Sequence, residues 1–347
     1  MSAPATPRAI DVHHHYAPPA YRAAAARYAR TDPEFARLNA NIAPGDDGAP
    51  LARLDLRLAE MDGSAIDVAV LSVNPASAAP ADAGQATEMF AAANDGLLDA
   101  CAAHPDRFVM MAALPLPHAS AALAELDRLA GNPALRGVCV GVGTLGYAPD
   151  RPEFAAVLER VAGMGLPLLL HPSLADPSLA ADPFASAFAE FGLTGGLRAM
   201  VATSLAALRL VLSGTLDRLP DLEVIVPHLG GVVPYLAQRL AEQGHGSQRN
   251  EISHYLRTRL FYDNCSFHDP AFRCALDTVG AGRVMLGSDY PYRGALDRCL
   301  SSMRRCGLGA EIERSISVVT ASRWFVPGAG PRAGILRLER PSHEGVA

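Results

Sequence analysis

The sequence predicts an α/β fold, a (β/α)8 TIM barrel, and two features of its pattern carry this prediction. Short runs rich in Val, Leu and Ile alternate with Ala-rich stretches whose apolar residues follow helical spacing. Eight such pairs fit within the 347 residues, and eight pairs close a parallel barrel. An open doubly wound sheet is the alternative, but it would require a Gly-rich phosphate loop after its first strand. Three consecutive histidines stand there instead.

The expected strands are continuous apolar runs, as strands buried on both faces of a parallel sheet require. They cover residues 9–15, 67–73, 107–114, 137–142, 166–171, 223–228, 259–265 and 283–289. The expected helices lie between the strands and repeat apolar residues three and four positions apart. They cover residues 51–61, 85–104, 119–129, 153–164, 205–219, 232–242, 270–279 and 294–305.

Two connections are longer than a barrel needs, and both follow strands. Residues 16–50 come after the first strand and residues 172–204 after the fifth. Long loops after strands are where barrels carry lids and substrate contacts. No repeat or linker divides the chain, so a single domain over 1–347 is expected, with an extended tail over 326–347 that is rich in Gly, Pro and charge.

Composition excludes several classes of function. The formal net charge of -6 offers no excess of basic residues for a phosphate backbone, so a small-molecule substrate is expected and nucleic acid is not. The chain contains no lysine, which excludes a Schiff-base lysine, a P-loop lysine and a carbamylated lysine bridging two metals.

Cysteine usage and hydropathy indicate in which cellular compartment the protein is expected. The six cysteines have no Cys-x-x-Cys spacing and the chain begins without a basic-then-apolar leader, so free thiols in a reducing cytoplasm are expected. Pro, Gly or charge interrupts each apolar run before the roughly 18 residues of a membrane span, so no membrane association is expected.

Five polar residues mark the ends of four expected strands. His13 and His15 end the first strand, His171 the fifth, His228 the sixth and Asp289 the eighth. The carboxyl ends of barrel strands meet at one rim, which is the face on which barrel enzymes build their active sites. A lone buried histidine is more often a hydrogen-bonded core residue than a ligand, but the agreement of four strand ends favours a metal site.

The spacing of the histidines supports a shared ion. His13 and His15 are two residues apart and point to the same side of a strand, whereas His14 points to the other side and is expected to be a packing residue. Three neutral imidazoles and the carboxylate of Asp289 suit one divalent ion, with Zn²⁺ first and Mn²⁺ or Fe²⁺ also compatible.

His228 precedes Leu229-Gly230-Gly231 and the start of an expected helix. Beside a metal, its imidazole can take a proton from water or donate a hydrogen bond to a substrate oxygen. Asp289 can serve both as a ligand and in proton transfer. Backbone N–H groups of the glycine turn can also face the site, and a tight strand-to-helix turn is the equal alternative for the two glycines.

At these residues the chain resembles the amidohydrolase superfamily, in particular the branch of 2-amino-3-carboxymuconate 6-semialdehyde decarboxylase and related aromatic-acid decarboxylases. The similarity runs from about residue 9 to residue 325. The matching stretches are Ile10-Asp11-Val12-His13-His14-His15, Glu60-Met61-Asp62, His104-Pro105-Asp106-Arg107-Phe108, Leu170-His171-Pro172, His228-Leu229-Gly230-Gly231 and Leu286-Gly287-Ser288-Asp289-Tyr290-Pro291.

The resemblance implies one metal ion held by His13, His15, His171 and Asp289, with His228 acting on water or on the substrate. It also implies substrate-carboxylate contacts at positions that match Arg57 and Arg239, the latter reaching across a homodimer interface. Either arginine can equally be an ordinary helix-surface residue. Two departures bear on the substrate: the usual His-Gly-Gly-Gly reads His228-Leu229-Gly230-Gly231, and the usual Asn-Ala reads Thr320-Ala321.

The leading functional hypothesis is metal-dependent, non-oxidative decarboxylation of a small aromatic or unsaturated carboxylic acid. The alternative keeps the same site and changes the reaction to hydrolysis of a lactone, ester or amide. A non-catalytic barrel that only binds metal or a partner is a third possibility, but such a protein would not need ligands delivered from separate strand ends to one point.

Overall fold

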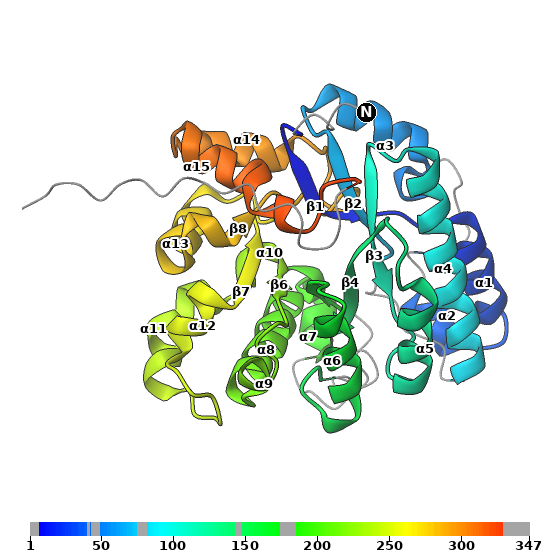
Figure 1. Cartoon of the computed structure of the whole chain (residues 1–347), viewed down its shortest axis with the longest axis horizontal. Helices are drawn as coiled ribbons and strands as arrows, with labels where there is room; N and C mark the ends of the chain where they lie inside the picture. The colour runs from blue at the N-terminus through cyan, green and yellow to red at the C-terminus, as the bar shows by residue number, and fades with distance from the viewer. Residues whose placement is uncertain are drawn as a thin grey trace, which may run out of the picture.

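The fold is described by a computed structural model, which covers residues 7–39, 42, 49–74, 82–142, 148–173 and 185–328. Within these residues, eight parallel strands form one sheet in the order of the sequence, β1 to β8 (Figure 1). Val12 N donates to Leu286 O at 3.0 Å and His15 N to Tyr290 O at 2.8 Å, which joins the first strand to the last. The predicted (β/α)8 barrel is therefore confirmed.

The eight strands agree with the expected apolar runs, although several are shorter. They are β1 (Ile10–His15), β2 (Val68–Ser72), β3 (Phe108–Ala113), β4 (Leu135–Val142), β5 (Leu168–Pro172), β6 (Val224–Val226), β7 (Leu260–Asp263) and β8 (Val284–Met285). Strand β6 ends at Val226, before His228, and β8 ends at Met285, before Asp289, and both His228 and Asp289 have positive φ, which no regular strand residue has. These two side chains therefore sit on the turns that follow their strands.

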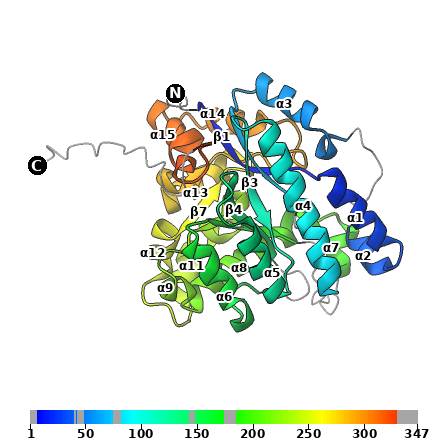
Figure 2. The same cartoon turned by 45° about the vertical axis from the view of Figure 1, so that its right-hand side comes forward.

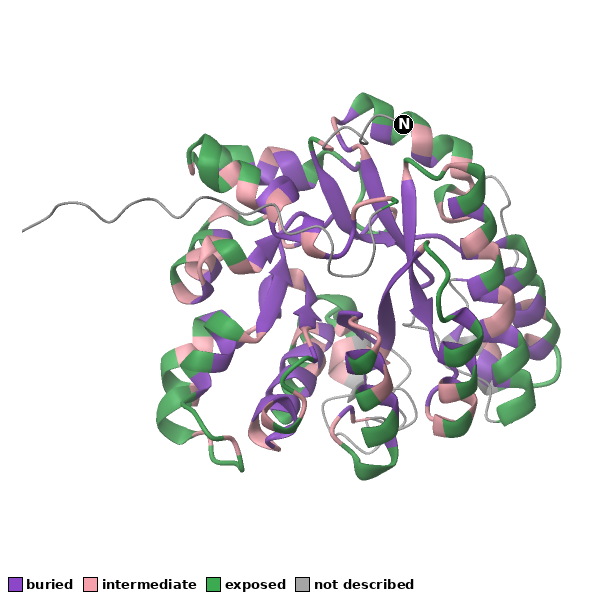
Figure 3. Cartoon of the chain, in the orientation of Figure 1, coloured by how far each residue is buried: buried purple, intermediate pink, exposed green. Residues whose placement is uncertain are grey.

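The helices that cover the sheet lie at or near their expected positions. They are α3 (Leu54–Gly63), α4 (Ala83–Ala103), α5 (Ala119–Leu129), α6 (Ala155–Gly163), α8 (Ala199–Leu212), α9 (Thr215–Arg218), α11 (Val233–Gln243), α13 (Asp269–Val279) and α14 (Arg298–Arg305). Figure 3 shows buried strands at the centre and helices that are exposed only on their outer faces. This burial accounts for the continuous apolar strands in the sequence.

The long connection after β1 contains two helices that the sequence analysis did not predict, α1 (Pro19–Ala29) and α2 (Pro33–Leu38). Residues 16–50 were expected to be a long loop, but proline is favoured in the first turn of a helix, where α1 places Pro19. Helix α1 packs beside α4 on the outside of the barrel (Figures 1 and 2). Part of the long connection 16–50 lies outside the described residues, as does most of the predicted tail, 329–347.

Helix α8 begins earlier than expected because a π-helix, η5 (Thr194–Arg198), leads into it. Among the described residues, one helical stretch, Thr194–Leu212, is long and apolar enough to cross a membrane. The sequence analysis expected no stretch of this kind. Such a match is weak evidence, because α8 packs against β4 and β5 through buried residues such as Leu210 and Val211. Its position is in the wall of the barrel.

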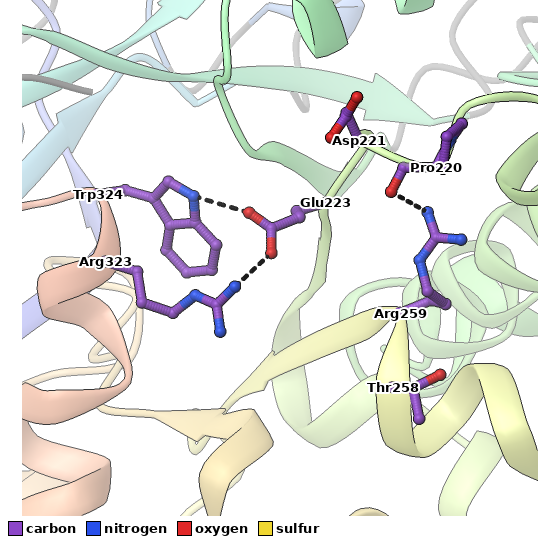
Figure 4. Close-up of a pocket in the computed structure, with 7 residues that line it drawn as sticks. All are labelled: Pro220, Asp221, Glu223, Thr258, Arg259, Arg323 and Trp324. Atoms are coloured by element: carbon purple, nitrogen blue, oxygen red, sulfur yellow. Dashed lines mark hydrogen bonds and ion pairs between the residues drawn. The ribbon is translucent and has the colours of Figure 1, made fainter. Parts of the chain in front are cut away.

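The amino-terminal end of the barrel is closed by η7 (Ser315–Val319) and η8 (Ala321–Arg323), which the sequence analysis did not predict. Trp324 and Phe325 are buried with the inward-facing strand residues. Glu223, just before β6, accepts from Trp324 Nε1 at 3.0 Å and from Arg323 Nη2 at 2.7 Å (Figure 4). This floor leaves the opposite rim, where the strands end, as the open side.

Candidate metal centre

Four side chains predicted from the strand ends lie together at the carboxyl rim. The ligand atoms of His13, His15, His171 and Asp289 all lie within 4.8 Å of one another. His15 Nε2 is 3.1 Å from His13 Nε2 and 3.1 Å from His171 Nε2, and it is 3.2 Å from Asp289 Oδ1. Nitrogen atoms at this spacing around a common point are the arrangement expected of ligands to one ion.

The remaining nitrogen of each imidazole is bonded to the protein. His13 Nδ1 contacts Asp263 Oδ2 at 2.7 Å, His15 Nδ1 contacts Ser72 Oγ at 3.1 Å, and His171 Nδ1 contacts the carbonyl of Pro172 at 3.0 Å. Partners of this kind fix the tautomer and ring orientation of metal-binding histidines. All three rings therefore present Nε2 to the centre.

The electrostatics of the cluster also suit a cation. Burial alone would lower the pKa of His13, but the carboxylates of Asp289 and Asp263 raise it to about 9. Burial lowers the pKa of His171, as do the neighbouring imidazoles of His15 and His13. Burial opposes ionisation of Asp289, but His13 and the hydrogen bonds from His15 and His228 hold its pKa well below the ordinary value. Buried donors of this type are stabilised by a bound divalent ion.

His228 lies beside the cluster rather than within it. Its Nε2 is 3.4 Å from Asp289 Oδ2, its ring centroid is 5.2 Å from that of His13, and its side chain is only 10% exposed. Within the described residues, Nδ1 of His228 is buried without a hydrogen-bond partner. The imidazole is thus positioned to exchange a proton with Asp289 or with a molecule bound at the centre.

A strained turn holds His228 in this place. His228, Leu229, Gly230 and Gly231 all have positive φ, at 56°, 57°, 78° and 63°. A β-carbon on Gly231 would lie 2.5 Å from Met200 O, so the tight-turn interpretation of the glycines is supported. Leu229 adopts a conformation that costs a non-glycine residue about 1–2 kcal/mol. The backbone N–H of His228 donates to Asp263 Oδ1 at 2.7 Å and is therefore unavailable to a ligand.

Arg57 is placed behind the centre and not at its opening. The residue is fully buried; Nε donates to His14 Nε2 at 2.6 Å, and Nη2 donates to the carbonyl of His15 at 2.6 Å. His14 in turn bonds through Nδ1 to Asp11 Oδ2 at 2.9 Å. These contacts contradict a direct contact between Arg57 and a substrate carboxylate, because its donors are used to hold the end of β1. His14 has the packing role expected of it.

Replacement of Arg57 by methionine is expected to lower stability rather than substrate affinity. The variant leaves buried acceptors on His14 and His15 unpaired, at a cost of about 2–4 kcal/mol in the free energy of unfolding. Urea denaturation measures this loss, with Arg304→Met, an exposed position on α14, as the control that stays within about 0.5 kcal/mol of the parent. An Arg57→Met protein with unchanged stability and a raised KM would contradict the positioning role.

Arg239 is exposed on α11. Several residues around the centre were missed by the sequence analysis. Asp263 ends β7 in a Tyr-Asp-Asn-Cys stretch and was a recognisable signal, since it is the acidic end of a buried strand. Ser72 gives no such signal, because serine is common at strand ends. Tyr292, whose ring lies 5.5 Å from that of His15, follows the Asp289 motif and is 39% exposed.

Comparisons with known proteins agree with the geometry. A family model described as amidohydrolase matches residues 10–294. A γ-resorcylate decarboxylase from Rhizobium sp. (strain MTP-10005) is 32% identical over 283 residues, covering 75% of this chain and 85% of that protein. A 2-amino-3-carboxymuconate-6-semialdehyde decarboxylase from Dictyostelium discoideum is 25% identical over 249 residues, covering 69% and 66% of the two chains.

Solved structures show the same fold. A 5-carboxyvanillate decarboxylase from Novosphingobium aromaticivorans, complexed with manganese and 4-hydroxy-3-methoxy-5-nitrobenzoic acid, superposes with a TM-score of 0.80 at 25% identity. The match covers 92% of this chain and 96% of that one. Since the family model spans most of the barrel and the relatives share the fold across nearly their full length, the chain belongs to the amidohydrolase family.

Proposed function

We propose that this chain is a metal-dependent, non-oxidative decarboxylase of a small aromatic carboxylic acid. The observation that carries the proposal is the convergence of three imidazoles and Asp289 at the barrel rim, with His228 Nε2 at 3.4 Å from the same carboxylate. The decarboxylases among its relatives support this choice of reaction. The enzyme is accordingly a carboxy-lyase of the amidohydrolase family.

The donor set fits one divalent ion, held by His13, His15, His171 and Asp289. When bound, such an ion stabilises negative charge that develops on a carboxylate and on a neighbouring oxygen of the substrate. Zinc suits the ligand types, and manganese or iron suits them also. The manganese bound to the related carboxyvanillate decarboxylase supports Mn²⁺ as the resident ion, and metal analysis of the purified protein distinguishes the three.

The remaining chemistry is proton transfer and release of CO₂. The pair formed by His228 and Asp289 holds a proton beside the reacting carbon and delivers it to the ring carbon that bears the carboxylate. The electron pair of the bond between ring and carboxylate then returns to the ring, and the carboxylate leaves as CO₂. One proton is consumed and one C–C bond is broken, so no oxidant or reductant is needed.

The substrate is recognised by its ring and its charge. The half-exposed ring of Tyr292 lies edge-on to His15 and offers a surface for an aromatic ring next to the centre. Arg239 supplies a guanidinium for the carboxylate from the partner chain of a homodimer, which suits its exposure on α11. No nucleic acid or membrane takes part in this proposal.

Release of CO₂ from a panel of hydroxybenzoates and carboxymuconate-like acids tests the reaction. The metal-loaded protein is expected to decarboxylate at least one member, with one equivalent of CO₂ formed per substrate consumed. Inactivity on the whole panel, together with cleavage of a lactone, ester or amide, would establish the hydrolase alternative. Loss of activity in the presence of a chelator and its return with Mn²⁺ or Zn²⁺ links turnover to the ion.

Exposed apolar residues on η5 and α8 support a homodimer. Leu193, Leu197, Val201 and Leu205 recur every four residues and are 41%, 46%, 46% and 57% exposed. On α11, Tyr235 is 83% exposed and lies one turn before Arg239. Exposed apolar residues gathered on one stripe mark an interaction surface more often than scattered ones do.

The double variant Val201→Glu, Leu205→Glu is expected to convert the dimer to a monomer, because two charges would be buried in the interface. Sedimentation velocity measures the mass as two chains for the parent and one for the variant. Leu56→Glu, at a 37% exposed leucine on α3, is the matched control and keeps the mass of two chains. A parent that sediments as a single chain at all concentrations contradicts the proposal.

A single domain over 1–347 and a cytoplasmic location complete the proposed description. The six cysteines are all free thiols, five of them buried, which supports a reducing compartment. Limited proteolysis that yields one resistant core supports a single domain.

A further inference from the structure

A second group of potential ligands lies next to the four described above. The side chains of His13, His228 and Cys265 each offer a ligand atom, and these atoms lie within 4.8 Å of one another. Cys265 is 1% exposed and lies two residues after Asp263, the last residue of β7, to which its backbone N–H donates at 3.0 Å. This group shares His13 with the four ligands described above and includes His228.

The imidazole of His228 has an unused nitrogen. In the part of the chain that the structure describes, Nδ1 has no hydrogen-bond partner although it is buried, and the side chain is 90% shielded from solvent. A buried polar atom without a partner is uncommon in native structures and calls for an explanation, such as a bound ion. A metal ion bound through Nδ1 would supply that partner.

We propose that His13, His228 and Cys265 form a second metal position, selective for thiophilic ions such as Cd²⁺ and Cu⁺. A thiolate with two imidazoles is a soft donor set, whereas three imidazoles with a carboxylate accept harder ions such as Mn²⁺. When the ion binds, the S–H bond loses its proton to solvent and a sulfur–metal bond forms, with no change in oxidation state.

The two positions exclude each other because they share His13. Asp263 occupies Nδ1 of this residue at 2.7 Å, so only Nε2 is free to bind an ion. A soft ion at the second position therefore removes one ligand from the first and also takes His228 away from the substrate. Given the proposed function, such an ion inhibits the enzyme; its binding does not depend on that function.

Ultraviolet absorption of the metal-stripped protein, titrated with Cd²⁺ alone, tests the second position. The parent is expected to develop a thiolate-to-cadmium charge-transfer band that saturates at one equivalent. Cys265→Ser is expected to lack the band and to bind Cd²⁺ at least about tenfold more weakly, since even an outer partner of a ligand contributes about that much to metal affinity. Cys274→Ser, which removes a partly exposed thiol on α13, keeps the band.

Two further measurements show whether the Cys265 variants still fold and whether the two metal positions exclude each other. Cys265→Ser and Cys265→Ala are expected to take up one equivalent of Mn²⁺, as the parent does. In the parent, Cd²⁺ displaces Mn²⁺, which the electron paramagnetic resonance signal of released Mn²⁺ records. A band that persists in Cys265→Ser, a parent without the band, or simultaneous binding of both ions overturns the proposal. None of these readouts requires turnover.

Discussion

Alanine at His13 is expected to remove both the metal ion and the activity. The side chain supplies a ligand atom at the centre of the cluster, where its Nε2 lies 3.1 Å from that of His15. Outer partners of metal ligands contribute about 10–100-fold to affinity, so loss of a direct ligand lowers metal affinity by at least about 100-fold. Elemental analysis is expected to fall from one equivalent per chain to near zero, and turnover to fall with it.

His13 also pairs with the buried carboxylate of Asp263, so its removal has a folding cost that must be separated from loss of the ion. His171→Ala serves this purpose, because Nδ1 of His171 contacts the neutral carbonyl of Pro172 and not a buried carboxylate. This variant is expected to lose the ion with a smaller fall in melting temperature. His254→Ala, at an exposed position on α12 (Ile252–Thr258), should match the parent in both measurements. A His13→Ala protein that retains a full equivalent of metal would rule out the ligand role.

Asparagine at His228 is expected to abolish turnover while leaving the ion in place. Asparagine suits this position because it tolerates the positive φ of 56° better than alanine does. It cannot exchange a proton at neutral pH, so kcat is expected to fall by about 10²–10⁴-fold, the usual contribution of general acid–base catalysis. Metal content is expected to stay near one equivalent, because His228 is not among the four proposed ligands.

Steady-state kinetics and elemental analysis on the same preparation distinguish the two roles of histidine at this site. His254→Asn is the matched control, with unchanged kcat. If His228→Asn loses the ion as completely as His13→Ala does, His228 is a ligand and the assigned proton-transfer role is wrong. If the variant keeps both ion and kcat, another group supplies the proton.

Much of the barrel could be predicted because its strands leave a direct record in the sequence. Burial on both faces makes each strand a run of apolar residues, and polar residues at the ends of such runs stand out. His13, His15, His171 and Asp289 were found in this way, although β8 itself is only two residues long. His228 was found in the same way, at the end of the sixth expected strand, and its proton-transfer role was inferred from its position beside the metal ligands.

The remaining features depend on contacts that no local pattern records. The hydrogen bonds of Arg57 to His14 and His15 form only when β1 and α3 pack together. The resemblance implied a substrate contact for Arg57, and its alternative was a position on the helix surface. Helix α1 was read as a loop because proline marks both helix starts and turns. The proximity of Cys265 to His228 joins residues from the loops after β7 and β6, which only the closed barrel brings together.

Each orienting contact described for the three histidine ligands comes from a residue on or at the end of a strand: Ser72, Asp263 and the carbonyl of Pro172. Asp263 also binds the backbone of His228, so one carboxylate ties the proton-transfer residue to a ligand on another strand. Insertions or exchanges in the loops after β2 and β5 would therefore leave the metal ligands in place, whereas the turns after β6 and β8 carry His228 and Asp289 themselves. Directed evolution toward new carboxylic-acid substrates is best confined to those loops, where substitutions leave the metal ligands unchanged.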